Sequence, residues 1–292
     1  MTERRAAWWF LAPALLLLGG FFFLPVLVAF GLSFTDWDLY ALADPANVRF
    51  VGLDNYLELF RLPLFWQALG NTVYFAVVGG LLAMGVALGL ALLLHSKLAR
   101  WTTFYRTALF SPVVTTLVAV AVVWRYLLHT RYGFVNYLLG TVGIEPIDWL
   151  GDPSWSIPAI LLLATWKNFG YNMLLFLAGL QAIPEELYEA ARIDGASAWA
   201  EFRHVTLPML RPTFVFVGIL TLVGYLQLFA EPYVMTQGGP VQSTVSIVYL
   251  MYDEGFKWWN MGFASAVAFV LLALILVLTR LQFRWAGREG GR

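Results

Sequence analysis

The sequence has no cysteine among its 292 residues, so it can form neither a disulfide framework nor a reactive thiol. Charged residues are also scarce, at 12%, and the formal net charge is zero. This balance excludes a broad electrostatic attraction to nucleic acid, and we expect no nucleic-acid partner. Metal-ligand clusters are missing from the sequence as well, because the three histidines, His95, His129 and His204, stand alone.

The sequence also lacks the common motifs of ATP-binding and hydrolytic enzymes. None of the three lysines, Lys97, Lys167 and Lys257, is followed by Ser or Thr, which excludes a Walker A loop. Neither an HExxH pair nor a nucleophile elbow occurs. We therefore predict that the chain is not an enzyme and binds no metal or cofactor of its own.

Apolar residues are abundant, at 60%, and the mean hydropathy of +0.72 lies outside the range of soluble proteins. A helix needs about 20 apolar residues to cross about 30 Å of hydrocarbon. Six stretches meet this count, at residues 6–32, 75–94, 107–124, 157–180, 213–230 and 261–278. The sequence thus predicts an all-α integral membrane protein with six transmembrane helices. We expect a single transmembrane domain over 1–292, with a first span at about 6–32 and core spans within about 70–283.

The distribution of lysine and arginine predicts the orientation, because cytoplasmic segments carry an excess of both. An even number of spans places both termini on one side. Twelve basic residues lie on that side against four on the other. The twelve are Arg4, Arg5, Lys97, Arg100, Arg106, Arg192, Arg203, Arg211, Arg280, Arg284, Arg288 and Arg292. We therefore expect both termini, and the loop at about 182–212, to be cytoplasmic.

This loop is polar and suited to helix formation, although it lies between two apolar spans. Pro184 is expected to begin a helix with two carboxylates in its first turn. Gly195 is expected to end that helix in a left-handed conformation. Ser197 should cap a second short helix, which Pro208 closes. A small face at helical spacing suits the close approach of a soluble partner; it comprises Ile183, Leu187, Ala190, Ala191 and Asp194. The alternative is an amphipathic helix lying on the lipid surface.

Two clusters of polar residues lie inside predicted spans. Lys167 stands about ten residues into its span, where a lone ammonium is costly against lipid. We expect Lys167 or Asn168 to share a face with Tyr171 and Asn172. Such a face suits a hydroxyl-rich ligand, or it joins neighbouring helices by hydrogen bonds. A second stripe in the next span consists of Thr221, Gly224, Tyr225 and Leu228.

Several strings resemble known transport proteins. The segment from Glu189, with Gly195 and the later Leu207-Pro208, is similar to the EAA loop of binding-protein-dependent ABC importers. Residues 65–72, 177–184 and 236–240 resemble a carbohydrate-type ABC importer permease, similar to the maltose and glycerol-3-phosphate permease subunits. Together these strings extend over most of the chain.

The resemblance implies a multi-pass permease of a bacterial or archaeal plasma (inner) membrane, surrounded by lipid. It implies a second homologous permease subunit, an ATPase dimer that binds ATP and Mg, and an extracytoplasmic solute-binding protein. The implied substrate is a sugar or a sugar-like solute. The implied ATPase contacts are Glu189, Ala190, Ala191, Asp194, Gly195, Leu207 and Pro208. The implied solute contacts are Lys167, Asn168, Tyr171, Thr221, Gly224, Tyr225 and Leu228.

Other functions stay open at this point. Lys167 would also suit a glycerol-phosphate-type solute. An ion-coupled secondary transporter would need carboxylates in mid-span, and the sequence offers only Glu231 at the margin of a span. A structural scaffold would need neither Lys167 nor the EAA-like loop.

Overall fold

The structure is a computed structural model that describes residues 3–96 and 101–287. Over these ranges the regular elements are helices, together with one isolated β-bridge between Thr35 and Phe50. This confirms the predicted all-α fold. Four of the basic residues used to predict the orientation lie outside the described residues: Lys97, Arg100, Arg288 and Arg292.

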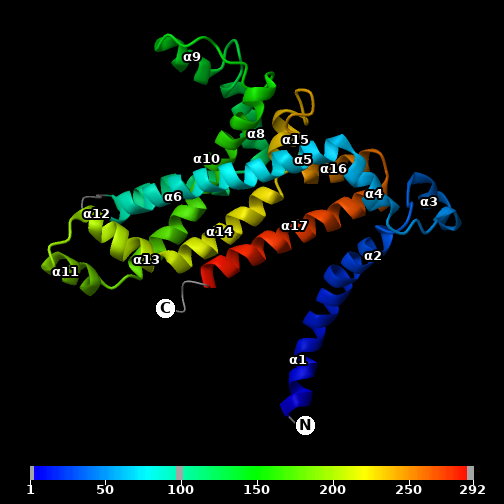
Figure 1. Ribbon diagram of the computed structural model, residues 1–292, viewed down its shortest axis with the longest axis horizontal. Helices are drawn as coiled ribbons and strands as arrows, with labels where there is room; N and C mark the ends of the chain where they lie inside the picture. Colours follow the sequence, from blue (N-terminus) through cyan, green and yellow to red (C-terminus); the bar gives the residue numbers. More distant parts are fainter. Residues whose placement is uncertain (1–2, 97–100, 288–292) are drawn as a thin grey trace. The chain divides into compact units, whose positions relative to one another are not determined.

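The helices are labelled in Figure 1. Their bounds are α1 Glu3–Leu18, α2 Leu24–Leu32, α3 Leu39–Ala43, α4 Asp54–Arg61, α5 Pro63–Tyr74, α6 Gly80–His95, α7 Thr102–Val114, α8 Leu117–Leu127, α9 Phe134–Thr141, α10 Pro153–Gln181, α11 Glu185–Ile193, α12 Ala198–Glu201, α13 Leu207–Met209, α14 Arg211–Leu226, α15 Ala230–Met235, α16 Ile247–Tyr252 and α17 Met261–Gly287. Wider π-helical turns lie at Gly19–Phe23, Phe75–Gly79, Phe202–Thr206 and Asp253–Lys257.

Five helical segments within the described ranges are long and apolar enough to cross a membrane. They are Trp8–Leu32, Pro63–His95, Pro153–Gln181, Arg211–Met235 and Met261–Arg284. These segments coincide with five of the six predicted spans, although several extend further along the chain. The hydropathy count therefore located them correctly.

The remaining predicted span, 107–124, is not one straight helix. It is a pair, α7 and α8, bent by 97° at Thr115 and Thr116, whose backbones are extended. Pro112 lies in the last turn of α7, where it supplies no N–H and crowds the preceding turn. The Thr115 hydroxyl donates to the Pro112 carbonyl at 2.6 Å, and this bond competes with continuation of the helix. The sequence prediction of a continuous helix was wrong at this corner.

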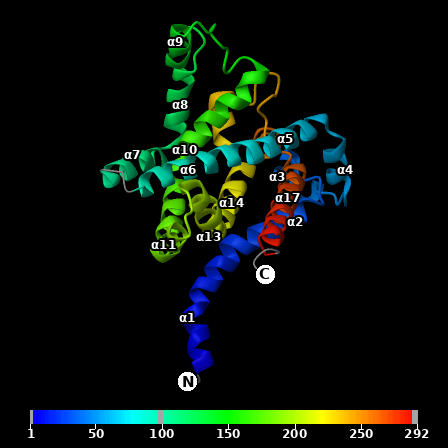
Figure 2. The same ribbon diagram turned by 60° about the vertical axis from the view of Figure 1, so that its left-hand side comes forward.

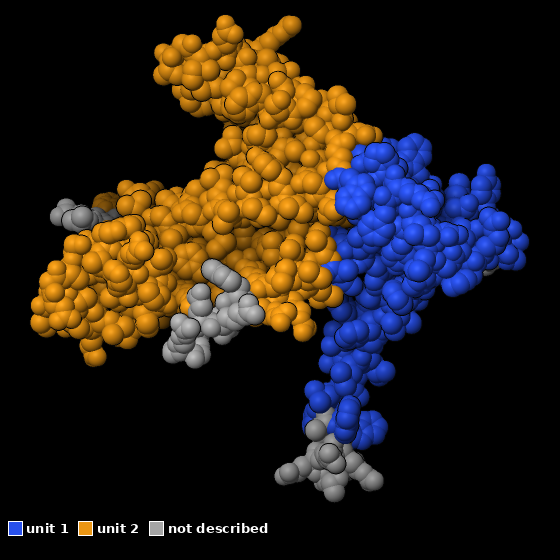
Figure 3. Space-filling model, viewed as in Figure 1, with its two compact units in different colours: residues 1–66, 250–273 blue, residues 67–249, 274–292 orange. Residues whose placement is uncertain are grey.

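The chain divides into two compact units, which Figure 3 colours separately. Unit 1 comprises residues 1–66 and 250–273, and unit 2 comprises residues 67–249 and 274–292. The predicted single permease domain over 1–292 is not tested by this division and stays a prediction.

Unit 1 is held together by polar contacts around the end of α2. The amide nitrogen of Asn55 donates to the carbonyls of Ser33 and Thr35, both at 2.9 Å. The backbone N–H of Arg49 donates to Asp36, and its guanidinium forms an ion pair with the same carboxylate at 2.8 Å. These contacts hold the pKa of Asp36 below its ordinary value.

Unit 2 is built around α10, which packs against α6, α7 and α14 (Figure 2). Small side chains allow this close packing. Ala83, Ala87 and Ala91 of α6 are fully buried, at the positions expected for one helical stripe. Met173 and Phe176 of α10 are also fully buried. The helices that bear the predicted solute contacts therefore belong to one packed core.

Candidate functional site

The segment between α10 and α14 forms a helical hairpin that is exposed along most of its length. Its first helix, α11, begins directly after Pro184 and carries Glu185 and Glu186 in its first turn, as predicted. Gly195 has a φ of +80°, and the next N–H, that of Ala196, donates to the Ala191 carbonyl at 2.9 Å. This is the predicted left-handed helix end, and glycine adopts it without strain.

The second arm of the hairpin begins as predicted but ends later. The Ser197 hydroxyl caps α12 by accepting the N–H of Ala200 at 3.3 Å. The chain then runs through the wide turn Phe202–Thr206 into α13, which contains Pro208. The prediction that Pro208 closes the helix was wrong. The π-helical turn directly before Pro208 interrupts the regular pattern of helical hydrogen bonds. A residue without a backbone N–H can therefore follow it without ending the helix.

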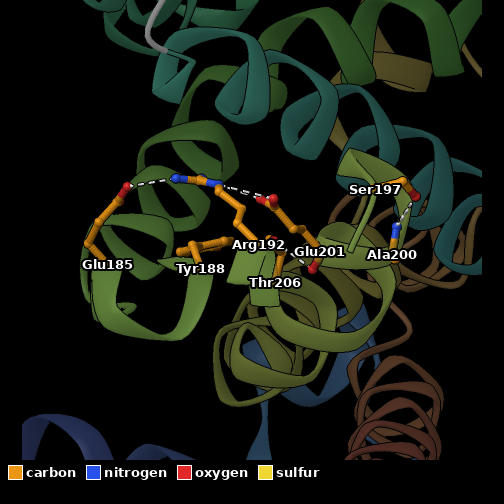
Figure 4. A network of polar contacts seen from close by, with 7 residues as sticks. All are labelled: Glu185, Tyr188, Arg192, Ser197, Ala200, Glu201 and Thr206. Carbon is orange, nitrogen blue, oxygen red and sulfur yellow. Dashed lines mark hydrogen bonds and ion pairs between the residues drawn. The ribbon is translucent and has the colours of Figure 1, made fainter. Parts of the chain in front are cut away.

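Side-chain contacts fasten the two arms of the hairpin to each other (Figure 4). Arg192 lies between two carboxylates, donating to Glu201 at 3.1 Å and to Glu185 at 3.5 Å. The hydrogen bond and the negative charge of Glu201 raise the pKa of the Arg192 guanidinium above its ordinary value. The hydroxyls of Tyr188 and Thr206 lie 3.0 Å apart. The two arms are therefore joined by both a charged and a neutral contact.

The predicted ATPase contacts lie on the outside of this hairpin. Six are exposed and one is partly buried: Glu189, Ala190, Asp194, Gly195, Leu207, Pro208 and, partly buried, Ala191. The structure adds two large apolar side chains that the sequence prediction missed, Ile193 at 85% exposure and Trp199 at 67%. Their signal was an Ile and a Trp on either side of the turn glycine of a polar loop.

Lys167, in the middle of α10, is bound to the end of a neighbouring helix. Its ammonium donates to the carbonyls of Pro112 at 2.8 Å and Val113 at 2.9 Å. Because α7 ends at the corner after Val114, these carbonyls have no α-helical partner. A cation at a helix C-terminus also interacts favourably with the helix dipole. The geometry matches the helix-joining alternative that the sequence left open.

Gly170 lies one turn after Lys167 and makes the closest approach of α10 to α7. A Cβ at this position would collide with the carbonyl oxygen of Leu109 and lie 3.1 Å from Cα of Phe110. The two backbones are therefore in direct contact. Lys167 and Gly170 together form what we call the α7 clamp.

Behind the predicted solute face, polar groups are buried between helices. The Asn172 amide donates to the Thr221 hydroxyl at 3.0 Å and so joins α10 to α14. Tyr225 and Leu228 are only 3% and 6% exposed. The Tyr225 hydroxyl is buried beside the side chains of Thr165 and Asn168. Among the described residues, neither it nor the Thr165 hydroxyl makes a hydrogen bond of good geometry. Buried hydroxyls without a well-formed hydrogen bond are rare, so these two groups can still accept or donate one.

Other predicted solute contacts lie on open surface. Asn168, Tyr171 and Gly224 are exposed, and a Cβ at Gly224 would meet nothing within 4 Å. The predicted shared face therefore holds for Asn168 and Tyr171, whereas Lys167 turns to α7 and Asn172 turns to α14. We call Asn168, Tyr171 and Gly224 the open face.

Glu231, at the start of α15, was considered only for an ion-coupled transporter and is absent from the predicted solute contacts, yet it is only 6% exposed. An acidic residue inside an apolar stretch is costly and indicates a functional or paired position. The sequence alone could have indicated Glu231, because it is an acidic residue at the edge of an apolar stretch.

The chain belongs to the family of binding-protein-dependent transport system inner membrane components, whose sequence model matches residues 7–288. It is 40% identical over 247 residues to the lactose transport system permease protein LacF of Rhizobium radiobacter, which covers 83% of this chain and 82% of LacF. It is 36% identical over 268 residues to the sn-glycerol-3-phosphate transport system permease protein UgpA of Brucella abortus biovar 1 (strain 9-941), which covers 91% of this chain and 89% of UgpA. The resemblance to this family is thereby confirmed.

The fold is also that of a solved transporter chain. A bacterial alginate ABC transporter in complex with an alginate pentasaccharide-bound periplasmic protein matches with a TM-score of 0.81 at 21% identity, over 97% of this chain and 94% of that one. The chain is thus a helical membrane component of a binding-protein-dependent transporter.

We predict that the α7 clamp stabilises unit 2. Lys167→Met removes the ammonium from the carbonyls of Pro112 and Val113, of which only that of Pro112 keeps another donor, Thr115. Gly170→Ala places a methyl group against the α7 backbone. Each change should lower the stability by about 1–3 kcal/mol. Thermal unfolding of the detergent-purified protein measures this as a lower midpoint. Gly89→Ala is the matched control, because a Cβ there meets nothing within 4 Å. An unchanged midpoint for both clamp variants would contradict the prediction.

Proposed function

We propose that this chain is one transmembrane subunit of an ATP-driven ABC importer that moves a sugar or sugar-like solute into the cytoplasm. The family match over residues 7–288 carries the proposal. The 40% identity with LacF, a lactose transport permease, supports a sugar as the solute. ATP and Mg would bind to a separate ATPase dimer, which performs the hydrolysis.

The hairpin of α11 and α12 is the proposed docking site of the ATPase. Its predicted contacts are exposed, and Ile193 and Trp199 add apolar surface that a partner would bury. The Arg192 contacts with Glu185 and Glu201 fasten the two arms together. A hairpin joined in this way would pass the motion of the ATPase to α10 and α14.

The proposed solute path runs along the open face. Asn168, Tyr171 and Gly224 would face a second homologous permease subunit across the path. The buried hydroxyls of Tyr225 and Thr165 would supply hydrogen bonds from behind. Lys167, Thr221 and Leu228, predicted as solute contacts, would shape the wall through their contacts with neighbouring helices.

The proposed mechanism is alternating access. ATP-driven closure of the ATPase dimer would bring the two docked hairpins together, and the permease pair would open to a loaded extracytoplasmic solute-binding protein. Hydrolysis would then reset the transporter. The protein would lie in a bacterial or archaeal plasma (inner) membrane with both termini cytoplasmic.

A glycerol-phosphate-type solute is the second candidate, and the 36% identity with UgpA favours it. The position of Lys167 counts against it, because the ammonium that would pair with a phosphate already donates to two carbonyls. An ion-coupled secondary transporter is the least supported reading, since Glu231 alone would have to supply the coupling carboxylate.

We predict the orientation from the charge pattern. A single cysteine introduced at Ser197 should react with an impermeant thiol reagent only from the cytoplasmic side, and one at Gln242 only from outside. Both positions are exposed, and the chain has no native cysteine to interfere. Labelling of right-side-out and inverted vesicles makes the measurement, and the reverse pattern would contradict the proposed topology.

We predict that Glu189 couples the ATPase to transport. Glu189→Lys reverses an exposed charge at the proposed interface, and like charges across an interface cost several kcal/mol. Uptake and substrate-stimulated ATP hydrolysis in the reconstituted complex should both fall more than tenfold. Glu186→Lys is the matched control, because Glu186 lies on the same helix outside the predicted contact set. Wild-type activity of Glu189→Lys would refute the docking site.

We predict that the Tyr225 hydroxyl binds the solute. Tyr225→Phe removes only the buried hydroxyl and preserves the packing, while Tyr171→Ala removes a side chain of the open face. Each should weaken uptake by roughly tenfold to hundredfold, the usual effect of losing one desolvated polar contact. Solute affinity of the isolated binding protein should not change. The yield of assembled complex is measured beside uptake, and an equal fall in both would show a structural role instead.

A further inference from the structure

A polar cavity of about 560 Å³ lies in unit 2 at the end of α8 that leads towards α9. Its walls come from α8, the turn after it, and the end of α15, and α8 and α15 pack together (Figure 1). We propose that this cavity, here called the outer cavity, is a second carbohydrate-binding site that receives a neutral sugar before it reaches the open face. The direction of passage rests on the proposed import function, whereas the binding of sugar does not.

The size and the aromatic lining of the outer cavity suit a sugar. Binding sites for small molecules are commonly about 300–1,000 Å³. Tyr126 and Tyr132 line it and are 64% and 65% exposed. The His129 ring stacks on Tyr132 with centroids 3.5 Å apart and an interplanar angle of 13°. These rings offer flat apolar surface with polar edges, which matches a pyranose, whose C–H groups form flat faces and whose hydroxyls form the rim.

The charged groups of the outer cavity balance each other. Arg125 lines it, and its guanidinium donates to the Val234 carbonyl at a long 3.4 Å. Asp148 also lines the cavity, and one of its oxygens, Oδ1, accepts from the Thr130 hydroxyl at 2.8 Å and the Gly151 N–H at 3.1 Å. Among the described residues no hydrogen bond reaches its Oδ2. The Arg125 guanidinium donates hydrogen bonds and the Asp148 carboxylate accepts them, and a sugar hydroxyl can do both. Because the two side chains carry opposite charges, the cavity favours a neutral solute over an anion.

The wall that carries Asp148 is held in place by a buried amide. Asn136 is 6% exposed, and its nitrogen donates to the carbonyls of Thr130 at 3.1 Å and Ile147 at 2.8 Å. Its oxygen accepts from the Trp149 indole at 2.9 Å. Because the binding groups are held before the ligand arrives, little conformational entropy is lost on binding.

The outer cavity is connected to the proposed solute contacts through α15, which packs against α8 and α10. Met235 and Thr236, at the end of α15, line it, and Glu231 lies one helical turn before Met235, about 6 Å along the axis. Tyr225 and Leu228 directly precede α15 in the chain. A sugar leaving the outer cavity would therefore reach the mid-membrane groups within a short distance.

The experiment measures sugar binding to the permease–ATPase complex in lipid nanodiscs without solute-binding protein. The probes are two radiolabelled neutral sugars, lactose and maltotriose, and one radiolabelled anionic solute, glycerol 3-phosphate. All variants carry Tyr171→Ala, so that binding at the open face is weakened. Tyr132→Ala and Asp148→Asn should each lower the affinity for the neutral sugars about tenfold or more. Asp148→Asn preserves an Oδ1 acceptor for Thr130 and Gly151, which keeps the wall folded.

The matched control is Tyr137→Ala, because Tyr137 is 70% exposed on α9 and does not line the outer cavity. Its sugar affinity should equal that of its parent. Three results would overturn the inference: no binding of either neutral sugar at concentrations on the order of 10 mM, unchanged affinity in both cavity variants, or equal binding of glycerol 3-phosphate.

A second measurement separates a sugar site from a pocket for a side chain of the solute-binding protein. If Tyr132→Ala and Asp148→Asn weaken binding of that protein while sugar affinity is unchanged, the cavity is a docking pocket and the inference is wrong. The proposed function has its own readout. Its failure would appear as absent uptake by the wild-type transporter despite sugar binding in the outer cavity. Failure of the inference leaves uptake intact in Tyr132→Ala introduced alone, without Tyr171→Ala.

Discussion

The arrangement of unit 2 depends on how the chain satisfies its backbone where α7 stops. Inside hydrocarbon no water is available to carbonyls that a helix leaves unpaired, so a broken span needs an internal donor. Lys167 supplies three protons at one point and donates to the carbonyls of Pro112 and Val113. Gly170 lets the two backbones touch one turn away. The direction of α8, whose residues line the outer cavity, follows from this junction.

The junction also changes what an intramembrane lysine means. A lone ammonium in a span is costly, and a functional reading of Lys167 is the natural first hypothesis. Here the cost is offset by the end of a helix, whose dipole and terminal carbonyls both favour a cation. The groups left for a solute are then uncharged: the Asn168 amide, the Tyr171 ring and the buried hydroxyls of Tyr225 and Thr165. Such a set fits a hydroxylated solute better than a phosphate ester.

Local rules were enough to predict the hairpin before α14. The turn at Gly195 and the cap at Ser197 depend on the backbone preferences of single residues, and five spans depend only on apolar length. The corner at Thr115 was not predicted, because a count of apolar residues takes no account of Pro112 or of the threonines at 115 and 116. The partners of Lys167 and Asn172 could not be predicted, since they lie on helices that are distant in the sequence. The exposure of Ile193 and Trp199 could not be predicted either, because it depends on how the hairpin folds.

The corner between α7 and α8 has a consequence for the surroundings of the protein. Thr115 and Thr116 are extended and exposed, so part of the backbone there is open on the surface of unit 2. Acyl chains offer no hydrogen bonds, and non-helical backbone at membrane depth is stable only against protein or a water-filled space. When the bent pair lies in the membrane, this side of unit 2 is therefore closed to lipid. The backbone at the corner therefore identifies a surface of unit 2 that must contact another subunit or water instead of acyl chains.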